Sequence, residues 1–425
     1  MDFNGERQLE SEYVMGTYAR KPVELVRGRG MEVEDSEGRT YLDFVSGVGA
    51  VSLGHCHPAL VSALQKQAHT LVHVSNYYYI ERRGEVARAV SDLLNACVPQ
   101  DERIPWRSFF ANSGAEANEC AFKLARLHAK KRAAARAAEQ GGDDAAQRAA
   151  MDAAPRLIVT LDASFHGRTL ATLAATAQPA KQEAFQPLPD GFVRTPINDV
   201  AALEELFARQ GDAVCAVVVE CVQGESGVHP CTAEFLQAAR RLTRQTGALL
   251  VCDEIQCGMY RCGTYPFGFQ HFGVTPDAVT IAKGVASGFP MGMCAARAEV
   301  ADSFEPGDHG STFGGSCLAV AAAGATIEAL AAEDVASNVE RVGAHLRERL
   351  ALLPGVVEVR GLGLMVAADL DEGLSAPDVV ARGLDAGLLL NFTGPRTLRF
   401  LPPLVCSKED VDVLAERLEG LLASA

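Results

Sequence analysis

The sequence has few lysines, no CxxC pair and no long apolar run. Its lysines are Lys21, Lys66, Lys123, Lys130, Lys131, Lys181, Lys283 and Lys408, so few compete for a catalytic role. The twelve cysteines lie mostly in apolar runs, which predicts reduced core residues. No run approaches the roughly eighteen apolar residues of a membrane span. The first residues, MDFNGERQLESEY, lack the apolar core of a signal peptide. A cytoplasmic location is therefore expected.

The charge balance disfavours two classes of partner. The net charge is −15, from 39 basic and 54 acidic residues. An acidic surface repels nucleic-acid phosphates and anionic membranes, so neither is expected as a partner. An acidic substrate remains possible, because a local arginine cluster outweighs a distant net charge.

Short apolar runs predict an α/β core. The runs RLIVTLDA, AVCAVVVE, GALLVCDE and DAVTIAKG are rich in β-branched residues and apolar almost throughout, as in parallel strands buried on both faces. Helical segments such as TAEFLQAARRLTRQTG separate them. With 425 residues, two or three domains are expected. The pattern indicates a central, mostly parallel sheet covered by helices.

Two regions depart from this alternation. Residues 130–154 are alanine-rich and charged, with a Gly-Gly break, which predicts an exposed helical extension without chemistry. The last hundred residues have helices, then strands (VVEVRG, LMVAADL, LLLNF, TLRFLPPLV) and a closing helix, which predicts a smaller α+β domain. The expected division is 1–70, the N-terminal part of the small domain; 71–325, the large domain; and 326–425, the rest of the small domain.

A junction between a strand and a helix carries the first candidate site. Ser113, Gly114 and Ala115 follow the strand-like WRSFFAN and open a helix. Free N–H groups and the helix dipole at such an N-terminus bind phosphate well. Taken alone, this segment favours the simpler interpretation of ordinary capping by Ser113, with Glu116 three residues later as a capping box.

Asp253 and Lys283 end two of the predicted strands. The carboxyl ends of parallel strands are where α/β folds bind ligands. A lysine desolvated there has a lowered pKa and a nucleophilic amine. Asp253 could instead be a metal ligand or part of a buried ion pair. No cluster of further ligands accompanies it, so no metal site is predicted.

Other candidates follow strands or lie in loops. Phe165 could stack on a flat ring, and Arg168 could bind a carboxylate with two hydrogen bonds. His166 is interpreted as a hydrogen-bonded structural histidine. Ser311 and Thr312 form a hydroxyl pair in a turn, where capping is the simpler interpretation.

Two acidic residues and one arginine complete the candidates. Glu220 ends a buried strand, and Glu225 lies in a glycine loop where its carboxylate could approach an arginine. Arg399 stands beside the paired prolines of LRFLPP, which indicates a fixed loop rather than a freely solvated charge.

The order of these motifs resembles the class III aminotransferases, which use pyridoxal 5′-phosphate (PLP) and have PLP fold type I. The resemblance covers nearly the whole chain. The motifs that carry it are YLDFVSGVGAVSLGHCHP, SNYYY, FFANSGAEANE, FHGRT, DEIQCGM, PDAVTIAKG, GFPMG, GDHGSTFGG, EVRGLGLM and LRFLPPL. Within the family, the motifs of the acetylornithine branch are the most similar to these.

The resemblance implies a cofactor role for several residues. Lys283 would hold PLP covalently and move a proton between substrate and cofactor, and Asp253 would pair with the pyridinium nitrogen. Gln256 would contact the phenolic oxygen, and Phe165 would stack on the ring. Thr312 would reach the phosphate in the partner subunit of a homodimer with shared active sites. The remaining residues implied at the cofactor are Ser113, Gly114, Ala115 and Glu220.

The substrate side follows from the same resemblance. Arg168 and Ser311 would hold the substrate, and Arg399 would bind the α-carboxylate of glutamate. Glu225 would mask Arg399 when the amine donor has no carboxylate at that end. The implied reaction transfers the terminal amino group of N-acetylornithine to 2-oxoglutarate, giving N-acetylglutamate 5-semialdehyde and glutamate, as in arginine biosynthesis.

The sequence also departs from the family pattern. Cys221 stands where the family has proline, and Ser226 where it often has glycine; Tyr260-Arg261-Cys262-Gly263 replaces Gly-Arg-Thr-Gly, and Ser316-Cys317 replaces Asn-Pro. At about the position of Val48, the ornithine enzymes have a tyrosine that can bond a free α-amine. An apolar residue there favours a donor whose α-amine is acylated or absent. The alternatives are another ω-aminotransferase, acting on 4-aminobutyrate, succinyl-diaminopimelate, ornithine or lysine, and a fold type I PLP enzyme that does not transaminate.

Overall fold

The computed structural model describes residues 2–423 and contains a seven-stranded central sheet. Its strand order is β4-β12-β11-β10-β7-β5-β6. The strands are β4 Trp106–Ala111, β12 Gly292–Arg297, β11 Ala278–Ile281, β10 Leu249–Asp253, β7 Val214–Val219, β5 Leu157–Leu161 and β6 Phe192–Thr195. Only β12 pairs antiparallel with its neighbours β4 and β11, and the pairs from β11 to β6 are all parallel. The predicted mostly parallel sheet is confirmed.

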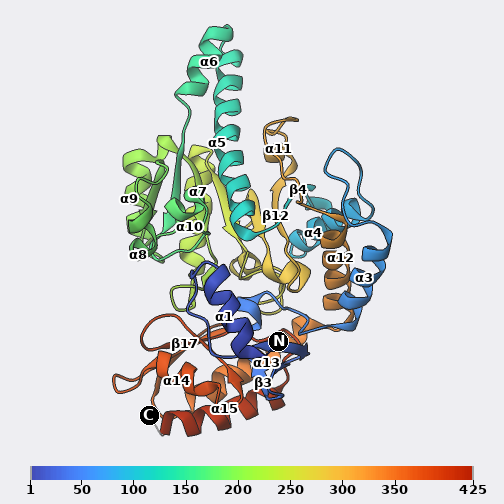
Figure 1. The fold of residues 1–425 in the computed structure, drawn as a ribbon. Helices are drawn as coiled ribbons and strands as arrows, with labels where there is room; N and C mark the ends of the chain where they lie inside the picture. The colour runs from blue at the N-terminus through green and yellow to red at the C-terminus, as the bar shows by residue number, and fades with distance from the viewer. Residues whose placement is uncertain (1, 424–425) are drawn as a thin grey trace.

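Helices cover both faces of this sheet (Figure 1). Successive strand residues point to opposite faces. Thus Val218 packs in the cluster with α5 (Gly114–Glu139), whereas Val217 packs in the cluster with α10 (Ala233–Thr246). Strands buried on both sides must be apolar throughout, which is why β7 reads VCAVVV. The other helices of residues 58–332 are α3 Pro58–Thr70, α4 Arg83–Leu94, α6 Asp144–Asp152, α7 Leu170–Ala175, α8 Pro179–Gln182, α9 Val200–Gln210, α11 Ala298–Ala301 and α12 Cys317–Ala332.

A second layer of strands and helices lies below the central sheet in Figure 1. Its antiparallel sheet has the order β13-β14-β17-β16, with β13 Val356–Leu362, β14 Met365–Leu370, β17 Thr397–Phe400 and β16 Asn391–Phe392. Its helices are α13 Val335–Ala351, α14 Ala376–Gly383 and α15 Lys408–Ala423. The N-terminal strands β1 Leu25–Arg29, β2 Glu32–Asp35 and β3 Thr40–Asp43 form another sheet with β15 Leu388–Leu389. The single strand expected over LLLNF is thus two, because β15 and β16 pair in different sheets on either side of Leu390.

The first 70 residues therefore join the C-terminal region through β3 and β15, which pair in parallel. The remaining short elements are α1 Phe3–Tyr13, α2 Ser46–Gly49, β8 Val222–Gln223 and β9 His229–Pro230. The expected boundary at 325/326 falls inside α12, and α12 packs on α3 and α4. The division into 1–70, 71–325 and 326–425 stays a prediction.

Residues 130–154 form the expected helical extension. Helix α5 runs on to Glu139, the chain turns at Gly141 and Gly142, and α6 packs back against α5. This arm projects beyond the central sheet at the top of Figure 1. None of its residues is buried, so it adds little to the core. Within residues 2–423, no helix combines the length and apolarity that crossing a membrane requires.

Candidate active site

The carboxyl ends of the parallel strands bring the predicted residues to one cavity of about 390 Å³. Glu220 directly follows β7, and Asp253 is the last residue of β10. Lys283 is the second residue after β11. Because these strands are parallel neighbours, their carboxyl ends share one edge of the sheet. The predicted residues that line the cavity are Ser113, Gly114, Ala115, Phe165, Arg168, Glu220, Glu225, Asp253, Gln256 and Lys283.

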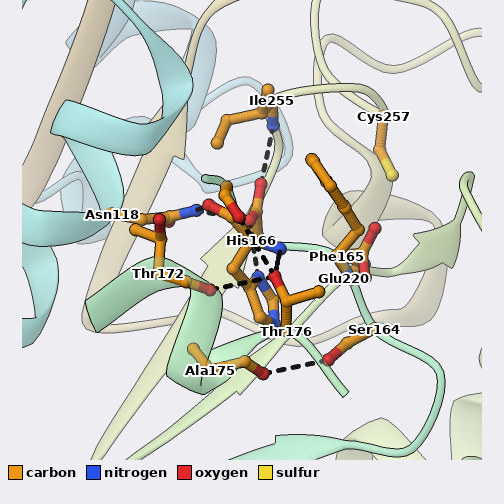
Figure 2. A network of polar contacts seen from close by, with 12 residues as sticks. Asn118, Ser164, Phe165, His166, Thr172, Ala175, Thr176, Glu220, Ile255 and Cys257 are labelled. Atoms are coloured by element: carbon orange, nitrogen blue, oxygen red, sulfur yellow. Dashed lines mark hydrogen bonds and ion pairs between the residues drawn. The ribbon is translucent and has the colours of Figure 1, made fainter. Parts of the chain in front are cut away.

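Asp253 is a buried carboxylate held by three donors. The donors belong to Asn118, His166 and Ile255, which are labelled in Figure 2. Its Oδ2 accepts hydrogen bonds from Asn118 Nδ2 and His166 Nδ1, both at 2.8 Å, and its Oδ1 accepts from the Ile255 backbone N–H at 3.1 Å. Donors on both oxygens fix the orientation of this carboxylate. A buried carboxylate so fixed is suited to pair with a cationic ring nitrogen.

His166 is hydrogen-bonded, as its interpretation as a structural residue predicted. Burial lowers the pKa of its imidazole, but the hydrogen bond to Asp253 and the charges of Asp253 and Glu220 outweigh this, and the net pKa is raised. Its Nε2 is buried and has no partner among the described residues. The sequence did not reveal that His166 and Asn118 support Asp253. Asn118 lies in a motif quoted for the resemblance, but its partner is 135 residues away.

Lys283 begins a short 3-10 turn, Lys283–Ala286, and has a backbone φ of 47°. A non-glycine residue in this left-handed region is strained, and such strain concentrates at functional sites. Burial lowers the pKa of the Lys283 amine; the charge of Glu225 opposes this, and that of Arg399 adds to it. A lysine with a lowered pKa supplies a neutral amine, which is the nucleophilic form.

The start of α5 offers backbone donors to the cavity. Ser113 Oγ accepts from the Glu116 N–H at 3.2 Å, which caps the helix as expected. In a capping box, the Glu116 carboxylate would in turn accept from the Ser113 backbone N–H. Here it accepts from the Asn112 backbone N–H instead, at 2.6 Å. The first N–H groups of a helix have no intrahelical acceptor, so those of Gly114 and Ala115 are available to an anion. A Cβ on Gly114 would lie 2.7 Å from Ile255, so glycine permits this close packing.

Glu220 fixes the segment that carries Phe165. Its Oε2 accepts from the Phe165 backbone N–H at 2.9 Å. Burial raises the pKa of Glu220 to about 7, while the charge of His166 opposes this and that of Asp253 adds to it. The Phe165 side chain lines the cavity, and the guanidinium carbon of Arg168 lies 5.6 Å from the centroid of its ring.

Arg399 and Glu225 form an ion pair, with Nη1 and Oε1 2.7 Å apart. Arg399 lies in β17, buried, and not in a loop as the prolines indicated. Asn391 Oδ1 accepts from its Nε and Nη2 at 3.0 and 2.8 Å, and the Gly224 carbonyl accepts from Nη1 at 3.0 Å. Burial alone would raise the pKa of Glu225, but Arg399 and Lys283 outweigh it and the pKa is lowered.

Gln256 lies between this pair and the cavity. Its Nε2 donates to Glu225 Oε1 at 3.4 Å, and its Oε1 is buried without a partner among the described residues. A Cβ at Gly224 would fall 1.7 Å from that oxygen, so the glycine leaves room for the amide. One N–H of the amide remains available to a ligand.

Ser311 and Thr312 lie away from the cavity lining of their own chain. Ser311 Oγ accepts from Asn112 Nδ2 at 3.2 Å and from the Gly314 N–H at 3.0 Å. Thr312 is exposed. The structure therefore leaves Thr312 outward-facing, and its expected reach into a partner subunit stays a prediction.

The fold and the position of this cavity define an α/β enzyme of the PLP-dependent transferase type, fold type I. The family model described as Aminotransferase class-III matches residues 15–422. This chain belongs to the class III aminotransferases.

Relatives match almost end to end. The chain is 41% identical to an acetylornithine aminotransferase of Caldanaerobacter subterraneus, over 97% of this chain and 98% of that protein. It is 43% identical to an acetylornithine aminotransferase of Thermosynechococcus vestitus, over 97% and 95%. Among solved structures, an ornithine aminotransferase of Toxoplasma gondii superposes with a TM-score of 0.87 at 31% identity, covering 100% of this chain and 96% of that one. An N-acetylornithine aminotransferase of Stenotrophomonas maltophilia superposes with a TM-score of 0.76 at 34% identity, covering 98% of each chain.

Proposed function

We propose that this aminotransferase binds PLP and transfers the terminal amino group of N-acetylornithine to 2-oxoglutarate, giving N-acetylglutamate 5-semialdehyde and glutamate. The observation that carries this proposal is one cavity lined by Lys283, Asp253, Arg168 and Glu225, with Arg399 paired to Glu225 behind its wall. Two arginines at one site suit the two carboxylates of glutamate.

The residues present fit PLP. The fixed carboxylate of Asp253 suits a protonated ring nitrogen, and the free N–H groups at the start of α5 suit a phosphate. Gln256 keeps an amide N–H for the phenolic oxygen, and Phe165 offers a ring face to stack on. The cavity lies within the roughly 300–1,000 Å³ of small-ligand sites. When bound, PLP supplies an electron-accepting ring that stabilises the negative charge left when the substrate loses a proton.

Lys283 has two tasks in this proposal. Its neutral amine would hold the cofactor, and as a free amine it would remove and return the proton on the reacting carbon. Its lowered pKa increases the share of the amine that is in the neutral, basic form. Asp253 holds the opposite side of the site, with its carboxylate oriented by three donors.

The Glu225–Arg399 pair lets one site accept two unlike substrates. For N-acetylornithine, the carbon next to the reacting amine carries no carboxylate, and Glu225 neutralises Arg399. For glutamate, the α-carboxylate replaces Glu225 on the guanidinium, which Asn391 and Gly224 continue to hold. Arg168, which lines the same cavity, would bind the carboxylate at the far end of either substrate.

Val48 supports an acylated donor over free ornithine. It is partly buried and packs against the apolar cluster that contains Cys257, a residue of the cavity wall. Its φ of 60° is strained for a β-branched residue. An apolar side chain offers no hydrogen bond to a free α-amine.

A homodimer with shared sites completes the proposal. Tyr77, Tyr79 and Phe313 expose 94%, 102% and 61% of their surface, and Asn76 Nδ2 donates to the Ser311 carbonyl at 2.7 Å, which ties their two segments together. Exposed aromatic surface next to Thr312 is typical of an interface. The cytoplasmic location and the place in arginine biosynthesis remain predictions from the sequence.

Absorbance spectroscopy of the PLP-loaded protein tests this function. N-acetylornithine should remove the visible band of the bound cofactor, and 2-oxoglutarate should restore it. A band that ignores N-acetylornithine but responds to 4-aminobutyrate or ornithine would move the activity to another ω-amino donor. A band that glutamate does not remove would overturn transamination.

A further inference from the structure

Lys181 lies beside the active site, where the sequence indicated no role for it. It belongs to the short helix α8, and its Nζ lies 5.3 Å from the centroid of the Phe165 ring. Arg168 approaches the same ring. Phe165 and Arg168 line the cavity, and Lys181 lies next to this part of its wall.

The ammonium group of Lys181 is held in place. Its Nζ donates to Gln178 Oε1, and Gln178 Nε2 donates to the backbone carbonyls of Ala163 and Ser164 at 3.3 Å each. Gln178 therefore ties Lys181 to the segment that carries Phe165. An ammonium group has three N–H donors, and within residues 2–423 this is the only hydrogen bond that Lys181 Nζ makes, so two donors remain for a ligand.

Positive charges outnumber negative charges around Lys181. Burial lowers the pKa of its amine; the charge of Glu225 opposes this, whereas those of Arg168 and Arg399 lower it further. Glu225 is already paired with Arg399. Among the described residues, neither Lys181 nor Arg168 forms an ion pair with a carboxylate. Two neighbouring cations without a counter-ion repel each other, and a bound anion removes that repulsion.

We propose that Lys181 is a specificity-determining residue that binds, together with Arg168, the carboxylate at the end of the substrate remote from the reacting amine. This proposal rests on the proposed function. The groups recognised are the α-carboxylate of N-acetylornithine and the side-chain carboxylate of glutamate and 2-oxoglutarate. Arg168 supplies a planar fork of donors, and Lys181 supplies a compact charge from a second direction.

Three amine donors separate this role from a structural one. N-acetylornithine carries the carboxylate and the acylamino group, 5-aminopentanoate carries only the carboxylate, and n-butylamine carries neither. In Lys181→Met, kcat/KM should fall for the first two donors on the order of ten-fold, mainly through KM, because a hydrogen bond to a charged group is lost. The value for n-butylamine should not change, and Lys181→Arg should restore most of the loss.

Two outcomes of that series would overturn the proposal. An equal loss with all three donors would mean that Lys181 only positions Phe165. A loss confined to N-acetylornithine would mean that Lys181 contacts the acylamino group. Lys123→Met is the control, because Lys123 is an exposed lysine that donates to the Asp308 carbonyl and should leave every value unchanged.

Binding of glutarate tests the proposal without turnover. Glutarate has both carboxylates of 2-oxoglutarate but no keto group, so calorimetry on the PLP-loaded protein reports affinity alone. The Kd should rise on the order of ten-fold in Lys181→Met and should depend less on salt than in the wild type. An unchanged Kd would overturn the proposal. If the wild type bound glutarate but did not transaminate N-acetylornithine, the proposed function would fail while the carboxylate site stood.

Discussion

Replacing Glu225 by glutamine should separate the two half-reactions of the enzyme. Glu225 Oε1 lies 2.7 Å from Arg399 Nη1, and the exposed fractions of the two side chains are 25% and 3%. In the variant, Arg399 keeps its contacts with Asn391 and the Gly224 carbonyl, so the guanidinium should stay in place without its counter-ion.

The size of the effect follows from what each substrate does to this pair. Hydrogen bonds to charged groups contribute about 1.5–3 kcal/mol, and the partial exposure of Glu225 favours the lower end of this range. Glutamate and 2-oxoglutarate must break the pair before their α-carboxylate binds. Their apparent affinity should therefore rise about ten-fold in Glu225→Gln, since about 1.4 kcal/mol corresponds to ten-fold. N-acetylornithine should lose a similar factor, because an uncompensated charge then faces its carbon chain.

Stopped-flow absorbance measures each half-reaction separately, with N-acetylornithine and with glutamate. Glu204→Gln is a matched control, because Glu204 pairs with Arg241 on the surface, where both side chains are about half exposed, and it should change neither half-reaction. If Glu225→Gln shifted both half-reactions in the same direction by the same factor, the exchange of partners on Arg399 would be refuted.

Three further predictions test other parts of the structure. Burial raises the pKa of Glu254 to about 7, so between pH 4.5 and 7 the folded state binds more protons than the unfolded state, and stability falls as pH rises. Glu254→Gln should reduce the difference in unfolding free energy between pH 5 and pH 7.5 by on the order of 3 kcal/mol, as measured by urea unfolding. If that difference were the same as in the wild type, Glu254 would not be its source. His166→Phe removes one of three donors to Asp253 and should raise the Kd for PLP about ten-fold, as measured by absorbance titration, and an unchanged Kd would show that the contact is dispensable. Replacing residues 133–153 by a short glycine-serine linker should leave kcat unchanged and shift the unfolding free energy by less than about 1 kcal/mol, because no residue of the arm is buried; a large loss of either would give the arm a role.

The sequence predicted the core of this site because strand ends are local features. Apolar runs locate β7, β10 and β11, and the residues that end them, Glu220, Asp253 and Lys283, meet wherever parallel strands lie side by side. The alanine-rich, charged composition and the Gly-Gly break of residues 130–154 likewise predicted the arm. These inferences need only the pattern of the strand or helix that carries the residue.

The sequence did not predict the distant contacts that support Asp253 and Arg399. Asn118 and His166 reach Asp253 across 135 and 87 residues, and neither has a local pattern that distinguishes it from a structural residue. Asn391 belongs to a run that looked like one continuous strand, but it lies in β16, where it pairs with β17 and binds Arg399. Lys181 is one lysine among eight, and only the fold brings it to Phe165.

Borohydride reduction of the PLP-loaded protein, followed by peptide mass spectrometry, tests the central claim most directly. The proposed function requires a covalent bond between the cofactor and Lys283, and reduction makes that bond permanent. The reduced cofactor should be found on the peptide that contains Lys283, and Lys283→Ala should carry no label and show no transamination. A label on another lysine in the wild type, or transamination by Lys283→Ala, would contradict the account.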